Sequence, residues 1–120
     1  METIQNIIQI VIAIGIFNVW ILRYGKSSSW RGGEAKNMKE EFQVYGLPSW
    51  FVGVIGFLKI LFALMLIVGL WFPALVQPAA IGIAVLMLGA IVMHIKVKDP
   101  VTKSLPAFSL LVLSAIVAFF

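Results

Sequence analysis

The sequence predicts an all-α protein: a four-helix transmembrane bundle with a short amphipathic interfacial helix in the first loop. Three observations predict this fold class. Hydrophobic residues make up 62% of the 120-residue chain and charged residues only 12%, whereas soluble domains have about 25% charged residues. The apolar residues gather in four long runs almost free of charge. Lys and Arg lie almost entirely between these runs. A chain of this length is expected to form a single integral membrane domain, residues 1–120.

Each apolar run approaches the length that a helix needs to cross a bilayer, which is about 20 residues for about 30 Å of hydrocarbon. The runs predict transmembrane helices over residues 4–22, 50–72, 74–95 and 105–120. The last run rises only ~24 Å, so we expect it to end at the far interface. The first run has no basic residues before it and no small-residue cleavage site, so we expect a transmembrane helix rather than a signal peptide.

The first loop has a helical pattern of its own. Ala35, Met38, Phe42 and Tyr45 recur with helical spacing, while polar residues occupy the positions between them. This pattern predicts an amphipathic helix over residues 34–45 at the membrane interface. The favoured interpretation is a connector or a cap on the bundle, and specific docking of a lipid or a partner is the alternative.

Charge predicts the orientation in the membrane. Eight of the nine Lys and Arg residues lie in the first and third loops, which share one face when four helices span the bilayer. Loops rich in Lys and Arg usually remain on the cytoplasmic side of a membrane. Both loops should therefore be cytoplasmic and the two termini outside, and the membrane is expected to be the cell (inner) membrane. Aromatic residues at the ends of the runs are expected to anchor the bundle at the two interfaces. These anchors are Trp20, Tyr24, Tyr45, Trp50 and Trp71.

Lys59 is the one charged residue within a predicted span. It lies about 13.5 Å along the helix from Trp50, close to the bilayer midplane. A charged Lys there costs about 2.5–3.5 kcal/mol, so it should face the bundle interior and have a polar partner. The small residues Gly56 and Ala63 beside it would let another helix approach. A functional pocket and a purely structural polar clasp both remain open.

Four polar residues are candidate partners of Lys59 in such a pocket. Asn18 lies within the first run, His94 near the cytoplasmic end of the third, and Glu41 and Asp99 in the flanking loops. For Asn18 and His94 a structural role is the favoured interpretation. No catalytic residue is predicted.

Several kinds of chemistry have no support in the sequence. Without Cys there is no thiol nucleophile, disulfide or thiolate metal site. One His and five scattered acidic residues predict no metal site. The net charge of +4 is expected to be balanced by the phosphate groups of membrane lipids, and no nucleic-acid partner is expected. The lipid bilayer is the expected surrounding, with other membrane proteins or further copies of the chain as lateral partners.

An ordered set of motifs resembles the DoxX-like family of small four-helix integral membrane proteins, over roughly residues 36 to 107. The motifs are Lys39-Glu40-Glu41-Phe42, Tyr45-Gly46-Leu47-Pro48-x-Trp50, Gly56-x-Leu58-Lys59-Ile60, Ala63, Gly69-Leu70-Trp71-x-Pro73, Leu86-Met87-x-Gly89-Ala90, His94, Lys98-Asp99-Pro100 and Lys103-Ser104-x-Pro106-Ala107. The resemblance implies a four-helix membrane fold. Proteins similar to this family include a small subunit associated with quinone-linked oxidation of sulfur compounds, and more distantly membrane chaperones and cargo receptors. It assigns no catalytic residue.

Three hypotheses about function follow. The favoured one is a non-enzymatic accessory or assembly subunit of a membrane complex, with a polar intramembrane pocket around Lys59 and no intrinsic cofactor. The second is a membrane subunit of a quinone-linked oxidoreductase, in which Lys59 hydrogen-bonds a quinone carbonyl. The third is a carrier of a small acidic or amphipathic molecule, neutralised in mid-membrane by Lys59.

Overall fold

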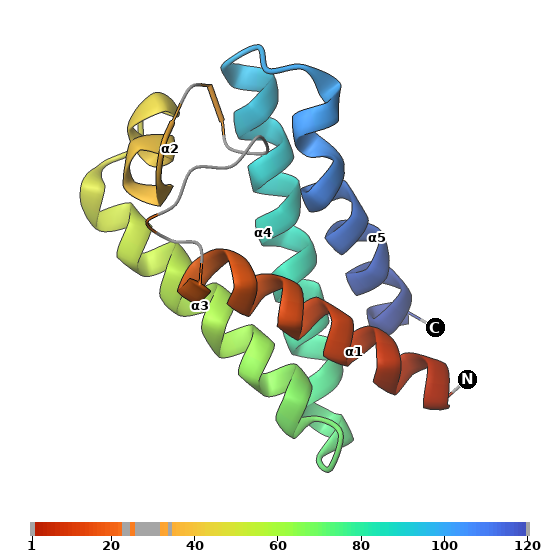
Figure 1. Cartoon of the computed structure of the whole chain (residues 1–120). Coiled ribbons are helices and arrows are strands. Elements are labelled where there is room, and N and C mark those ends of the chain that lie inside the picture. The colour runs from red at the N-terminus through yellow and green to blue at the C-terminus, as the bar shows by residue number, and fades with distance from the viewer. Residues whose placement is uncertain (1, 23–24, 26–31, 34, 120) are drawn as a thin grey trace.

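The computed structural model describes residues 2–22, 25, 32–33 and 35–119 (Figure 1). All regular elements in this part of the chain are helices, which confirms the predicted all-α class. Four helices are long and apolar enough to cross a membrane. Within the described residues these spans are Thr3–Leu22, Ser49–Val68, Pro73–Lys96 and Val101–Phe119. They contain α1 Glu2–Phe17 with its π-helical continuation Asn18–Leu22, α3 Ser49–Val68, α4 Val76–Lys96 and α5 Leu105–Phe119, the last two together with the 3-10 helices that precede them. The long axis of the molecule, 40 Å, matches a bilayer with its headgroup regions.

The outer surface of the four long helices is apolar. Phe57 in α3 is 66% exposed, and Ile14 in α1 and Leu88 in α4 are 61% and 54% exposed. Such a continuous apolar surface would be unfavourable in water and is stable in hydrocarbon. The protein is therefore a multi-pass membrane protein.

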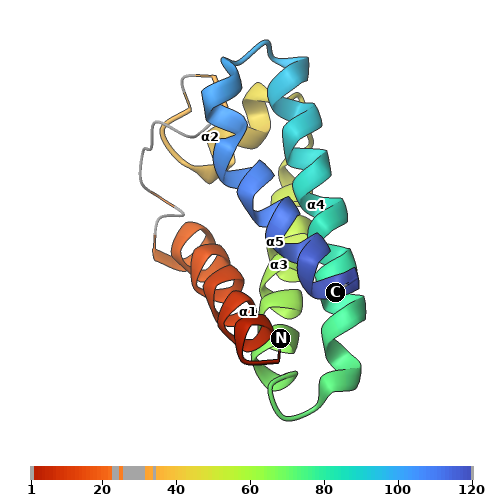
Figure 2. The same cartoon turned by 90° about the vertical axis from the view of Figure 1, so that its right-hand side faces the viewer.

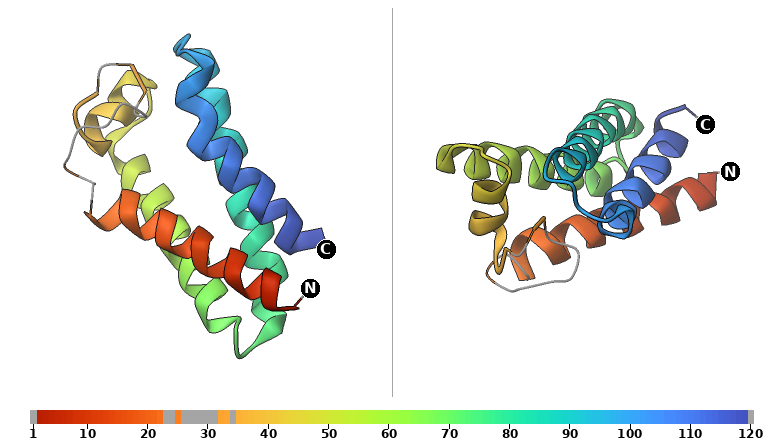
Figure 3. Two further views of the ribbon diagram at one scale, coloured as in Figure 1. Left: turned by 45° about the vertical axis from the view of Figure 1, so that its right-hand side comes forward. Right: turned by 90° about the horizontal axis from the view of Figure 1, so that it is seen from above.

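The helices form a closed ring in which α1 contacts α3 and α5, and α4 contacts α3 and α5. Helices α4 and α5 run side by side, whereas α1 crosses the bundle obliquely (Figures 2 and 3). Both termini lie toward one end, and α2 and the connection between α4 and α5 lie at the other end (Figure 1). The arrangement agrees with the predicted sharing of one face by the first and third loops.

Helix α3 ends earlier than the predicted 50–72 segment, because the chain turns after Val68. The amide of Gly69 still donates to the carbonyl of Met65, 2.8 Å away. A Cβ at Gly69 would lie 2.6 Å from the Val76 side chain, so only glycine allows this close approach. A short 3-10 helix, Pro73–Leu75, then leads into α4. A second 3-10 helix, Val101–Ser104, precedes α5.

The amphipathic helix of the first loop, α2, spans Met38–Val44 and is shorter than the predicted 34–45 segment. It starts where the side chain of Asn37 accepts a hydrogen bond from the amide of Glu40 (2.8 Å), a typical N-cap. It ends at Gly46, whose φ of 77° allows the amide of Leu47 to donate to the carbonyl of Phe42. The apolar face of α2 is buried against the bundle. Helix α2 therefore lies over one end of the bundle.

Candidate functional site

A cavity of about 750 Å³ lies beneath α2, lined by residues of all four membrane-spanning helices and of α2 itself. Toward the termini, α4 packs closely on α3 at a small residue, since a Cβ at Gly82 would lie 2.5 Å from the Phe62 ring. Toward α2, α3 and α4 separate (Figure 3). The cavity occupies this wider half, and the aromatic face of α2 covers it.

Lys59 lines the cavity from α3, on one helical stripe with Phe51 and Ile55. Its ammonium lies 5.3 Å from the centroid of the Trp20 ring, within cation–π distance. Among the described residues, the Lys59 ammonium forms no hydrogen bond or salt bridge. Its remaining donor capacity therefore faces the cavity.

Trp20, one of the predicted interfacial anchors, has its side chain buried in the bundle. Its side chain is 7% exposed and packs edge-to-face on Phe42, with 6.0 Å between ring centroids. Gly56 allows this packing, because a Cβ there would lie 2.7 Å from the indole ring. Trp20 thus forms a fixed aromatic wall beside the Lys59 ammonium.

The other predicted anchors differ in exposure. Tyr45 is 5% exposed, with its side chain turned into the bundle. Trp50 and Trp71 are 65% and 72% exposed at the two ends of the α3 segment, where an interfacial ring belongs. Tyr24 lies outside the described residues.

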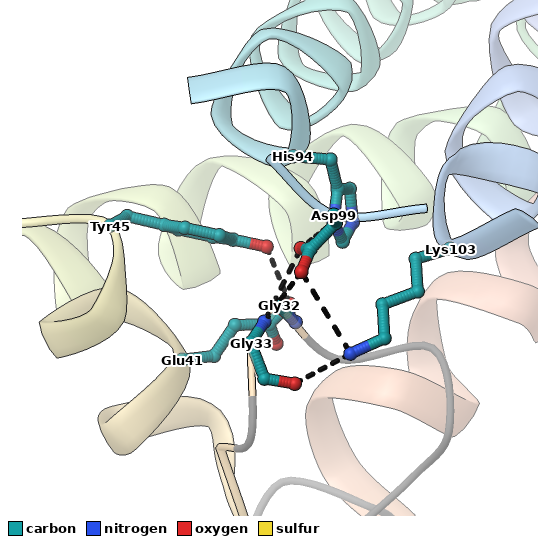
Figure 4. A network of polar contacts seen from close by, with 7 residues as sticks. All are labelled: Gly32, Gly33, Glu41, Tyr45, His94, Asp99 and Lys103. Carbon is teal, nitrogen blue, oxygen red and sulfur yellow. Dashed lines mark hydrogen bonds and ion pairs between the residues drawn. The ribbon is translucent and has the colours of Figure 1, made fainter. Parts of the chain in front are cut away.

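Glu41 and Tyr45 form a polar pair where α2 meets the cavity. The Tyr45 hydroxyl donates to a carboxylate oxygen of Glu41 (2.8 Å), and the amide of Gly32 donates to the same oxygen (3.1 Å) (Figure 4). Tyr45 also packs edge-to-face on the ring of His94, 5.9 Å away, and its carbonyl accepts a hydrogen bond from the Lys96 ammonium (2.8 Å). These contacts fix α2 to the end of α4.

Asp99 and His94 form a second pair, which joins the first and third loops. The ring Nδ1 of His94 and the Asp99 carboxylate are 2.8 Å apart, and the two side chains are 6% and 5% exposed. The amide of Gly33 donates to the same carboxylate (3.0 Å), while Lys103 lies 3.9 Å from it and donates to the Gly33 carbonyl (2.5 Å) (Figure 4).

The pKa of Asp99 reflects competing effects. Burial raises it, but the hydrogen bonds from His94 and Gly33 and the charge of Lys103 outweigh burial and hold the pKa below its ordinary value. The carboxylate is therefore ionised at neutral pH.

The backbone that ends α4 creates the pair. Lys98 has a left-handed conformation with φ of 60°, and the Asp99 amide donates to the His94 carbonyl (3.0 Å). Such a turn, typical of helix C-termini, folds the chain back over its last turn. The Asp99 side chain thereby meets the His94 ring.

The structure brings four of the five candidate pocket residues to one cavity. Asn18, Glu41, Lys59 and His94 all line it, and Asp99 contacts the cavity through His94. Sequence analysis placed Trp20 and Tyr45 at the interface and assigned no role to Lys103, yet all three line the cavity. The sequence contained one indication of these contacts: Tyr45 follows Glu41 by four residues and Lys103 follows Asp99 by four, a spacing that brings side chains together on a helical turn.

The arrangement suits binding of an amphipathic molecule. It combines two cations and one carboxylate with an aromatic face and a largely aliphatic wall, and its volume lies within the range of small-molecule sites, about 300–1,000 Å³. Across the described part of the chain, no three His, Cys, Asp or Glu side chains gather where they could hold a metal ion.

Comparison with known proteins identifies the family. No curated protein and no solved structure matches the chain. Residues 10–117 match the DoxX-like family, which extends the resemblance seen in the motifs to nearly the whole chain. The chain therefore belongs to the DoxX-like family.

Proposed function

We propose that this protein is a non-enzymatic accessory subunit of a membrane complex, and that it holds a small amphipathic molecule in the cavity around Lys59. One observation supports the proposal above the others: the Lys59 ammonium adjoins a cavity, and although it lies over the Trp20 ring and is attracted by the Glu41 carboxylate, it forms no hydrogen bond or salt bridge among the described residues. A cation kept in this state near the middle of a bilayer is costly. An anionic or carbonyl group in the cavity would offset that cost.

The charges around the cavity favour a ligand with an acidic or strongly polar end. Lys59 and Lys103 line it together with one carboxylate, Glu41. That carboxylate already accepts hydrogen bonds from Tyr45 and Gly32. Lys103 is directed to Gly33 and Asp99. Lys59 therefore remains the group that is free to meet a ligand.

The accessory role is supported by the large share of the chain that forms membrane-spanning helices. Most of the described residues belong to the four spans, and α2 is the one further α-helix among them. The apolar outer surface suits lateral contact with other membrane proteins. The excess of Lys and Arg in the first and third loops supports a cytoplasmic position for that end, in the inner membrane.

A quinone is the second candidate occupant, since an aromatic wall lies beside a hydrogen-bond donor. Trp20 would lie against the ring and Lys59 would donate to a carbonyl oxygen. In that case the protein would serve as a quinone-holding subunit of an oxidoreductase whose partner supplies the electrons.

Purification in mild detergent followed by native mass spectrometry tests the proposal. The wild-type protein should retain an amphipathic molecule or a partner subunit, and Lys59→Met should lose it while remaining folded. The mass separates a quinone from an acidic lipid. Phe57→Met, on the lipid-facing side of the same helix, is the matched control and should retain the molecule. Wild-type protein with nothing bound, or Lys59→Met with everything still bound, would overturn the proposal.

A further inference from the structure

The end of the cavity that faces the first and third loops is closed by hydrogen-bonded contacts among the described residues. Gly33 is bound to Asp99 and Lys103, which joins the first loop to the third. Lys96 is bound to the Tyr45 carbonyl, which joins α4 to the end of α2. These contacts tie the first loop, the third loop and α2 together across this end of the cavity.

The side of the cavity between α3 and α4 differs, because residues there both line the cavity and face outward. Val85 lines the cavity and is 63% exposed. Gly89, one turn further along α4, also lines the cavity and is exposed, and a Cβ at this position would meet nothing within 4 Å. Residues with both properties mark the rim of an opening. Because this surface of the bundle faces hydrocarbon, the opening leads into the bilayer.

The opening and Lys59 lie at similar depths. Along α4, the rim residues Gly89 and Val85 lie about 10 Å and about 16 Å from the loop-side end at Lys96, and along α3, Lys59 lies about 15 Å from the loop-side end at Ser49, within the same interval. A ligand whose acidic group lies at Lys59 can therefore leave its chain in the gap over Gly89. Met93 and Val85 continue this apolar path along α4.

From this geometry we infer that the ligand is a single-chain membrane amphiphile with one acidic head group, and that it reaches Lys59 sideways from the bilayer, through the gap between α3 and α4 at Gly89. The inference rests on the proposed function and names its ligand class and route. The acidic head group would neutralise the Lys59 charge, and the lateral opening requires a ligand that dissolves in hydrocarbon. A small water-soluble anion has no apolar part to contact the aliphatic walls, and it would not enter from hydrocarbon.

Photolabelling in proteoliposomes tests both the ligand class and the lateral route. The probe is a long-chain fatty acid with a diazirine near its carboxyl group, compared with the fatty alcohol of the same chain. Wild-type protein should be labelled by the acid in preference to the alcohol, on residues that line the cavity. Lys59→Met should abolish this preference. Equal labelling by acid and alcohol, or wild-type protein without cavity labelling, would overturn the assignment of an acidic amphiphile.

Two glycines provide a matched test of the route. Gly53 in α3 and Gly89 in α4 are both exposed helical glycines with open space around a Cβ, but only Gly89 lines the cavity. Gly89→Leu should fill the gap and lower labelling about tenfold, a loss equal to one decade in affinity. Gly53→Leu should leave labelling unchanged. Size-exclusion profiles check that both variants remain folded.

A variant that widens the gap keeps the test decisive if Gly89→Leu does not fold. Val85→Ala removes an exposed rim side chain and should speed labelling. Wild-type labelling rates in both rim variants would overturn the lateral route. Complete competition by acetate in the aqueous phase would do the same. Either outcome leaves the proposed function standing if native mass spectrometry still finds a molecule that is lost in Lys59→Met, so the two failures are distinguishable.

Discussion

Replacing Asp99 should loosen the junction between the first and third loops without unfolding the bundle. In the wild type the carboxylate accepts hydrogen bonds from His94 Nδ1 (2.8 Å) and the Gly33 amide (3.0 Å). Asp99→Asn keeps an oxygen for the Gly33 amide but loses the charge and one strong acceptor. Asp99→Ala leaves both donors without this acceptor.

The contacts set the size of the effect. Hydrogen bonds to a charged group contribute about 1.5–3 kcal/mol each. Lys103, 3.9 Å away with a side chain 22% exposed, adds little. Asp99→Asn should therefore lower the free energy of unfolding by about 1.5–3 kcal/mol, and Asp99→Ala by about 3–6 kcal/mol as an upper bound.

The lowered pKa of Asp99 predicts how this difference depends on pH. A carboxyl group with a folded pKa below its unfolded value stabilises the protein fully above the unfolded value, 3.8, and loses that contribution as the pH falls through the folded pKa. The difference between wild type and Asp99→Asn should stay constant from neutral pH to about pH 5 and shrink below pH 4.

Denaturant unfolding of the purified proteins in detergent, followed at several pH values, measures these quantities. Lys98→Ala, at an exposed neighbour whose side chain makes none of these contacts, controls for changes in the same turn. Asp99→Asn with wild-type stability at neutral pH, or with a difference that grows as the pH falls below 4, would refute the assigned role of the carboxylate.

Three further changes have definite expected outcomes. Lys98→Gly should raise the free energy of unfolding by about 0.5–1 kcal/mol, because relief of the left-handed strain at φ 60° exceeds the entropy cost of glycine; unchanged or lower stability would contradict this. Gly56→Ala should destabilise by about 1–3 kcal/mol, because its Cβ would lie 2.7 Å from the Trp20 ring; denaturant unfolding measures it, and no loss would show that the ring moves freely. In intact cells, a cysteine at Ser104 should resist an impermeant thiol reagent and one at Thr3 should react; the reverse pattern would invert the proposed topology.

The membrane-spanning helices could be predicted because bilayer thickness sets the length of an apolar run. Their ends could not be placed to the residue, since turn geometry decides them. Gly69 shows this: its close approach to Val76 and the turn before Pro73 end α3 at Val68, although the apolar run continues to Phe72. Hydropathy contains no information about such a contact.

The sequence predicts where the residues of the candidate site lie along their helices, but not which way their side chains face around the helix axes. Position along a helix placed Lys59 near the midplane, and the same argument placed Trp20 and Tyr45 near the interface. Both aromatic residues nevertheless face inward, because α1 and α2 turn those faces toward the cavity. The contact between His94 and Asp99 depends on a left-handed Lys98, a conformation that lysine rarely adopts and that no propensity predicts.

The polar groups in the other half of the bundle clarify what is unusual about Lys59. Gln9 is 2% exposed and donates to the Leu66 carbonyl (2.9 Å), and Gln77 donates to the Ala118 carbonyl (2.9 Å). Each side chain joins two helices through a backbone acceptor, which is how polar residues stabilise membrane bundles. Lys59 has the longest and most costly of these polar side chains to bury, yet among the described residues it joins no helix by a hydrogen bond and adjoins a cavity instead. Gln9 and Gln77 are satisfied by acceptors within the protein, whereas under the proposed function a bound molecule would supply the acceptor for Lys59.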